Sequence, residues 1–96
     1  MFKTIVGNTN RLTTTFYNFD NEQVNPNLVK FFLKDSFGKV IKEEILGEEN
    51  KLEIGKYFYD FIADKQGRFI VEFYGEISGK PNVDRELIIV TLLKEK

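Results

Sequence analysis

The sequence predicts an all-β domain, an antiparallel β-sandwich of about seven strands. Segments in which apolar and polar residues alternate, bounded by turn residues, recur about every ten positions, which is the spacing of a small sandwich or barrel. No segment sustains the 3.6-residue period of an amphipathic helix. The chain has 96 residues, of which 42% are hydrophobic and 15% aromatic, and this suffices for one modest core. We therefore expect residues 1–96 to form a single domain.

The first two predicted strands flank a polar loop. RLTTTFYNF (residues 11–19) places Leu12 and Phe16 on one face, and its three consecutive threonines favour a strand because β-branching restricts χ1. The loop NFDNEQVNPN follows. LVKFFLK (residues 28–34) then alternates, with Phe32 on the face opposite Val29, Phe31 and Leu33.

A hairpin is predicted after the second strand. The tetrad DSFG begins with Asp35 and ends with Gly38, which is the signature of a type I turn that leads into a G1 bulge. Its partner strand is KVIKEEIL (residues 39–46), whose apolar residues do not alternate cleanly. We expect an edge strand with a bulge or a break near Glu43 and Glu44, with a short helix as the alternative.

Three further strands complete the predicted sandwich. GKYFYDFI (residues 55–62) has large apolar side chains on both faces. RFIVEFYGEI (residues 68–77) and RELIIVTLL (residues 85–93) follow, separated by the predicted loop SGKPNVD. We place Leu87 and Ile89 on the core face of the last strand. The predicted core consists of Leu12, Phe16, Val29, Phe31, Leu33, Tyr59, Phe61, Phe69, Val71, Phe73, Leu87 and Ile89.

The predicted outer faces are too apolar for a free sandwich, in which they should be polar. A contiguous apolar patch larger than a few hundred Å² usually marks an interaction site. We therefore predict a protein interface at Phe32, Phe58, Ile70, Tyr74, Ile88 and Val90. Two other readings stay open. A one-residue register error would exchange outer and core residues. Otherwise, a loop or the N-terminal segment MFKTIV folds over the patch. Pairing through the edge strand KVIKEEIL is a further route to assembly.

The composition argues against most chemistry. The net charge of -1, from 14 basic and 15 acidic residues, favours binding to neither nucleic acid nor an anionic membrane. The chain has no Cys and no His, so disulfides, zinc sites and the familiar nucleophile–base pairs are excluded. The oxygen-rich segment NFDNEQ lacks the ligand spacing of an EF-hand loop, and turn chemistry explains it. We expect a non-enzymatic protein with no cofactor, no metal and no small-molecule ligand.

The N-terminus MFKTIVGNTN lacks the apolar run and the cleavage site of a signal peptide. The longest apolar run, Leu87 to Val90, is far shorter than the ~20 residues that span a bilayer. We expect synthesis in a cytoplasm, no secretion and no membrane partner.

With the strands placed, GKYFYDFIADKQGRFIVEFYGEISGK resembles the second half of small bacterial and phage immunoglobulin-like modules. The opening RLTTTFYNFDNEQVNP is similar to their first core strand, in which a Thr-rich segment precedes an acidic loop and an Asn-Pro pair. The resemblance covers about residues 7–91. The family usually has Tyr at Phe69, so the hydroxyl that pins a neighbouring loop is missing here. The matching positions are Gly55, Tyr57, Gly67, Phe69, Gly75 and Gly79.

The resemblance implies an immunoglobulin-like sandwich with a structural or docking role. The closest likeness is to a bacteriophage virion component that decorates a capsid, joins head to tail or sits on the tail. Its partners are then itself or larger virion proteins, and it is made in the host cytoplasm. The alternative is a ligand-binding or adhesin-type module that recognises a glycan or a cell-surface partner through an end loop, at Tyr17, Asn18 and Asp20.

Overall fold

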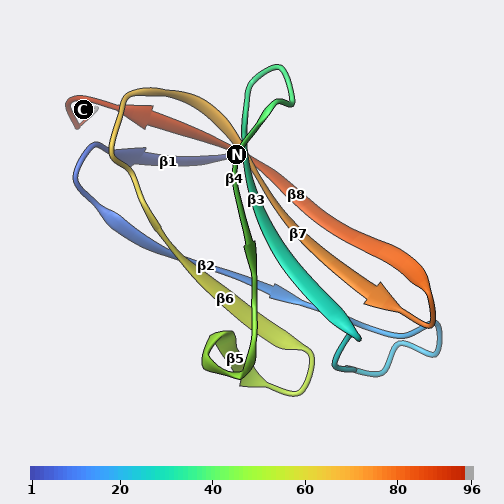
Figure 1. The fold of residues 1–96 in the computed structure, drawn as a ribbon. Helices are drawn as coiled ribbons and strands as arrows, with labels where there is room; N and C mark the ends of the chain where they lie inside the picture. The colour runs from blue at the N-terminus through green and yellow to red at the C-terminus, as the bar shows by residue number, and fades with distance from the viewer. Residues whose placement is uncertain (95–96) are drawn as a thin grey trace.

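The computed structural model describes residues 1–94 as two β-sheets that pack face to face (Figure 1). The elements are β1 (Phe2–Ile5), β2 (Thr9–Thr15), β3 (Leu28–Asp35), β4 (Val40–Ile45), the 3-10 helix η1 (Glu48–Asn50), β5 (Lys51–Glu53), β6 (Lys56–Ile62), β7 (Gly67–Ile77) and β8 (Lys80–Thr91). The sheets have the strand orders β1-β8-β7-β3-β4 and β2-β6-β5. The predicted all-β sandwich is confirmed. Strands pair antiparallel throughout, except that β1 and β8 run parallel.

The β3–β4 hairpin forms at the turn that the sequence predicts. The Asp35 carboxylate accepts hydrogen bonds from the backbone N–H groups of Phe37 and Lys39, each at 2.9 Å. Gly38 has a φ of 88°, in the left-handed region that favours glycine. The local side-chain and backbone chemistry of four residues therefore determines where this hairpin reverses.

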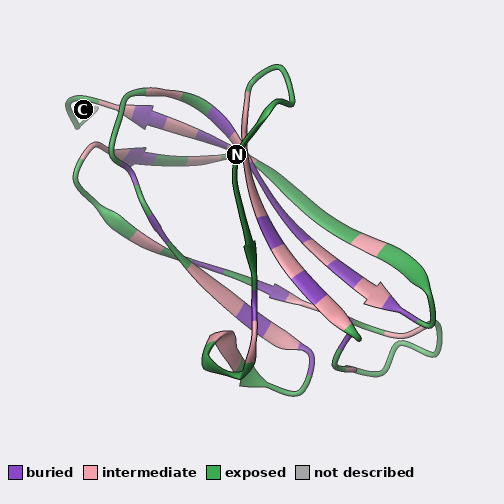
Figure 2. Cartoon of the chain, viewed as in Figure 1, coloured by how far each residue is buried: buried purple, intermediate pink, exposed green. Residues whose placement is uncertain are grey.

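Strand β4 is an edge strand, and Figure 2 shows it exposed along its whole length. The pairing with β3 skips Ile41, which is therefore the extra residue of the irregularity. The expected edge strand with an irregularity is therefore present, but the irregularity lies at Ile41 and not near Glu43 and Glu44, which both pair with β3 in regular register. The short-helix alternative for this segment is wrong as well.

Strands β7 and β8 join through the two-residue turn Ser78–Gly79, whose φ angles of 53° and 75° are typical of a type I′ hairpin. Strand β8 already begins at Lys80, so most of the predicted loop SGKPNVD is strand. Pro81 is tolerated there because β1 pairs with β8 only from Ile88 onward. The first half of β8 thus has a free edge at which the missing N–H of proline is not needed.

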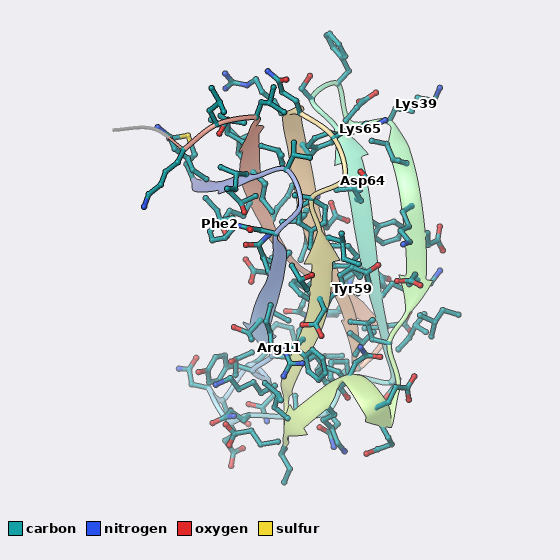
Figure 3. The ribbon with its side chains drawn as sticks, turned by 90° about the vertical axis from the view of Figure 1, so that its left-hand side faces the viewer. Phe2, Arg11, Lys39, Tyr59, Asp64 and Lys65 are labelled. Atoms are coloured by element: carbon teal, nitrogen blue, oxygen red, sulfur yellow. The ribbon has the colours of Figure 1, made fainter. Side chains whose placement is uncertain are left out.

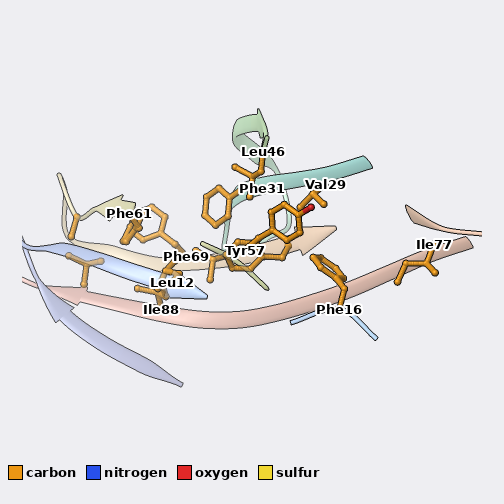
Figure 4. Close-up of a cluster of buried hydrophobic side chains, with 14 residues drawn as sticks. Leu12, Phe16, Val29, Phe31, Leu46, Tyr57, Phe61, Phe69, Ile77 and Ile88 are labelled. Atoms are coloured by element: carbon orange, nitrogen blue, oxygen red, sulfur yellow. The ribbon is translucent and has the colours of Figure 1, made fainter. Parts of the chain in front are cut away.

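The core lies between the two sheets (Figure 4). Phe31 is fully buried, its ring stacks on Tyr59 at 3.9 Å, and it meets Phe73 edge-on at 5.3 Å. Of the predicted core residues, Leu33 and Tyr59 are only partly buried against this cluster. The buried apolar residues are Leu12, Phe16, Val29, Phe31, Leu46, Tyr57, Phe61, Ala63, Phe69, Val71, Phe73, Ile77, Ile88 and Val90.

The predicted faces of the last strand are wrong. Ile88 and Val90 are 0% and 1% exposed, whereas Leu87 and Ile89 are partly buried on the opposite face. Ile88 pairs with Phe69 and so shares the core face of the sheet. The error has a physical reason: four consecutive apolar residues show no alternation, and a shift by one residue exchanges the two faces.

The N-terminal segment does not cover the outer face of the five-stranded sheet. Strand β1 pairs with β8, with Phe2 opposite Ile88 and Ile5 opposite Thr91. A strand that pairs at the edge lies in the layer of the sheet and extends it. The alternative that MFKTIV folds over the predicted patch is therefore wrong.

Candidate functional site

The outer face of the five-stranded sheet, here called the five-strand outer face, brings apolar side chains of all five strands together. Cross-strand partners share a face, and the register pairs Phe32 with Glu72, Lys30 with Tyr74, and Ile70 with Leu87. The half-buried apolar residues on this face are Ile5, Leu28, Phe32, Ile70, Tyr74, Leu87 and Ile89. Its more exposed apolar residues are Val40, Ile45 and Val83, which are 45%, 68% and 45% exposed.

Glu72 occupies the centre of this face and is nevertheless buried, with a side chain only 6% exposed. Its Oε1 accepts hydrogen bonds from Lys34 Nζ at 2.9 Å and from Arg85 Nε at 2.7 Å. Burial by itself would raise the pKa of Glu72, but the hydrogen bonds from these two cations outweigh it and hold the pKa below its ordinary value. Glu72 is therefore a carboxylate at neutral pH.

The cations of this face also lie against its apolar residues. Lys34 Nζ is 5.5 Å from the centroid of the Phe32 ring, and Lys30 Nζ bonds Glu43 at 3.1 Å. Long cationic side chains cover apolar surface with their stems while their heads stay hydrated. The five-strand outer face is thus a mixed surface on which apolar groups are half covered by movable charged chains.

The structure separates the six residues of the predicted interface into three places. Phe32, Ile70 and Tyr74 lie together on the five-strand outer face. Ile88 and Val90 lie in the core, so their assignment to an outer face is wrong for the reason given above. Phe58 is on β6, whose sheet packs on the other side of the core, so it cannot belong to the same patch. Alternation within single strands carries no information on which sheet a strand joins.

Phe58 is covered by its own neighbours on the outer face of the three-stranded sheet, the three-strand outer face. The Arg11 guanidinium lies 3.9 Å from the Phe58 ring centroid and makes two hydrogen bonds to the Asp60 carboxylate, at 2.8 and 3.0 Å. The hydrogen bond from Arg11 lowers the pKa of Asp60. On the second apolar face of GKYFYDFI, the Phe58 ring therefore contacts a cation from the adjacent strand β2.

The residues of the predicted ligand loop, Tyr17, Asn18 and Asp20, lie in one loop between β2 and β3. The side-chain oxygen of Asn18 accepts hydrogen bonds from the N–H groups of Asp20 and Glu22, at 2.9 and 3.0 Å. That oxygen therefore shapes the turn. Tyr17 is 51% exposed and Phe19 is 74% exposed. Within residues 1–94, no three His, Cys, Asp or Glu side chains cluster in a way that could hold a metal ion.

A groove that the sequence did not indicate lies between the edges of the two sheets, with a cavity of about 460 Å³. Phe31, Phe61 and Phe69 line it from the core, and Ile41 and Lys42 line it from β4. The signals in the sequence are faint: two apolar residues that turn out to be exposed, Ile41 on the edge strand β4 and Ile62 at the end of β6. Figure 3 views the molecule from the side on which this groove opens; Tyr59, Asp64 and Lys65, which also line it, are labelled there.

Comparisons of the chain with protein-family models, with curated proteins and with solved structures found no match. In residues 1–94 there is no helix with the length and apolar composition that crossing a membrane requires.

Proposed function

We propose that this chain is a non-enzymatic docking protein that assembles with itself or with larger proteins through the five-strand outer face. One observation carries the proposal. Half-buried apolar side chains from adjacent strands meet on this face, at Phe32, Ile70 and Tyr74, and no other element of residues 1–94 packs over them (Figure 1). Contiguous apolar patches larger than a few hundred Å² usually mark interaction sites, and these side chains are the ones that a partner would cover.

We further propose that the sandwich is immunoglobulin-like. The strand order supports this, because β8, β7, β3 and β4 follow one another as strands G, F, C and C′ do in a variable-type domain, opposite β2, β6 and β5 as B, E and D. Contacts between the amide protons of the parallel pair β1–β8 in solution would test this order. The virion as the place of assembly rests on the resemblance of the sequence to phage modules.

The direct test is the mass of the purified chain in solution, measured by light scattering over a range of concentrations. We expect a wild-type oligomer that the substitution Phe32→Ser/Tyr74→Ser dissociates without unfolding. Phe58→Ser is the matched control, because Phe58 is also a half-buried aromatic residue on an outer face, but on the other sheet. A wild-type chain that stays monomeric and binds no virion component contradicts the proposal.

The second candidate is an adhesin-type module that binds a glycan through the loop between β2 and β3. The exposed rings of Tyr17 and Phe19 favour it, since aromatic rings supply flat contact surfaces and this loop is held in shape by Asn18. Glycan binding that Tyr17→Ser abolishes, and that Phe32→Ser/Tyr74→Ser leaves unchanged, would favour this candidate over the first.

A further inference from the structure

Strand β6 has an unpaired edge beside the groove. It pairs with β2 along its whole length, from Lys56 to Ile62, but with β5 only at Lys56 and Tyr57. On the side away from β2, no strand of residues 1–94 pairs with positions 58–62. A strand edge of this kind presents backbone donors and acceptors to a further strand.

The backbone groups that face this edge belong to Phe58, Asp60 and Ile62, and the Phe58 carbonyl already accepts a hydrogen bond from the Asn50 side chain at 3.2 Å. Ala63 directs both of its groups to the β2 side: its N–H donates to the Asn8 carbonyl at 3.0 Å, and its carbonyl accepts from the Gly7 N–H at 2.8 Å. Alternate residues of an antiparallel strand direct their groups to opposite sides. Asp60 and Ile62 therefore present their N–H and C=O groups to the groove side.

The groove lies beside the part of β6 that the short strand β5 leaves unpaired. Strand β5 contains three residues and β6 contains seven, because η1 brings the chain to β6 only near its beginning. The groove lies where a longer β5 would run, and its cavity of about 460 Å³ is floored by the core residues Phe31, Phe61 and Phe69. Ile62, 61% exposed, adds an apolar surface at the outer rim.

We propose that this groove is a second docking site, which accepts an extended peptide segment of a partner protein. The segment adds a strand to the β6 edge and hydrogen-bonds Asp60 and Ile62 through its backbone. Its alternate side chains enter the cavity and must be apolar, because three phenylalanine rings form the floor. The charged lining residues include Lys42, Lys65 and Asp64, so polar residues of either sign suit the side chains that point away from the cavity.

The test begins with selection of peptide probes. Random peptides of about ten residues, a length that spans the free edge, are displayed and selected on the immobilised wild-type chain, and the selected peptides are synthesised with blocked ends. The key variant is Ile62→Pro. The substitution removes the backbone N–H of residue 62, which faces the groove. It leaves the hydrogen bonds between β6 and β2 intact, because this N–H does not take part in them. We expect selected peptides with apolar residues at alternate positions, and binding weakened by roughly tenfold or more in this variant.

Ile45→Pro is the matched control. Ile45 is 68% exposed on the edge strand β4, and its N–H faces away from β3 because the neighbouring Leu46 N–H donates to the Val29 carbonyl. This control should bind the peptides like wild type, and so should Phe32→Ser/Tyr74→Ser, whose failure to assemble concerns the other face. In the wild-type chain, saturating peptide should slow amide exchange at Asp60 and Ile62, a result that does not depend on any variant folding.

Three results would each overturn the proposal. The first is a selection that yields no binding peptide. The second is a set of selected peptides that bind Ile62→Pro as tightly as wild type. The third is the absence of any gain in amide protection at Asp60 and Ile62 when peptide is bound. Loss of binding in Ile45→Pro, with Ile62→Pro unaffected, would place the added strand on β4 instead.

Discussion

The two outer faces of the sandwich carry the same three chemical groups in different surroundings. Each has an aromatic ring, a cation beside that ring and a carboxylate that binds the cation: Phe32, Lys34 and Glu72 on the five-strand face, and Phe58, Arg11 and Asp60 on the three-strand face. The side chain of Glu72 is 6% exposed and that of Asp60 is 42% exposed. Glu72 has paired strands on both sides, whereas Asp60 lies beside the free edge of β6.

This difference determines how much carboxylate hydration a partner would remove from each face. Burying a charge costs free energy because its hydration is lost. On the five-strand outer face, the fold has already removed Glu72 from water and given it two cationic partners. A partner that covers this face therefore removes little further hydration from the carboxylate, and the hydration it removes is mainly that of Arg85, whose side chain is 59% exposed. Covering the pair of Arg11 and Asp60 would desolvate both the cation and the carboxylate.

The largest expected effect is that of Glu72→Gln. The substitution keeps the shape but weakens two charge-assisted hydrogen bonds and leaves Lys34 and Arg85 without their anion. We expect the free energy of unfolding to fall by about 1–3 kcal/mol. Urea denaturation followed by circular dichroism measures this, and a loss within experimental error would show that the buried ion group contributes nothing to stability.

An acid titration should show a smaller, graded effect. The pKa of Glu72 is lower in the folded chain than its ordinary value of 4.5. A depressed pKa gives stability that is fully present above the ordinary value and is lost as the pH falls through the folded-state pKa. The stability difference between wild type and Glu72→Gln should therefore shrink on acidification. A difference that stays constant from neutral to acid pH would contradict this assignment.

The smallest effect is expected for Asp60→Asn on the other face. Its carboxylate is well exposed and its partner Arg11 keeps the contact with the Phe58 ring, and exposed ion pairs contribute little because water and salt screen them. The midpoint of urea unfolding should stay within error of wild type. A loss as large as that of Glu72→Gln would remove the contrast between the two faces.

Local patterns allowed much of the fold to be predicted. Period-two alternation identified β2, β3, β6 and β7, and the Asp-to-Gly tetrad identified the β3–β4 turn, because the interactions involved join residues close in sequence. The prediction of which residues face the core failed in the last strand, where four consecutive residues are apolar. Strand β5 could not be predicted, since three residues, KLE, carry no period.

The candidate site could be predicted only in part, because it depends on which strands become neighbours. Alternation predicted only that Phe32, Ile70 and Tyr74 point away from the core, and they share one outer face because β3 and β7 are neighbours in the sheet. Phe58 could be excluded from this patch only by knowing that β6 joins the other sheet. The partners of Glu72 come from β3 and β8, and the groove exists because β5 ends early, so neither feature has a local signal.

The measurement that tests the central claim most directly is hydroxyl-radical footprinting of the wild-type chain, compared between dilute and assembled samples. Phe32 and Tyr74 on the five-strand outer face should lose reactivity on assembly, while Phe58 on the three-strand outer face should keep its own. Assembly that protects Phe58 and leaves Phe32 and Tyr74 reactive would contradict the account.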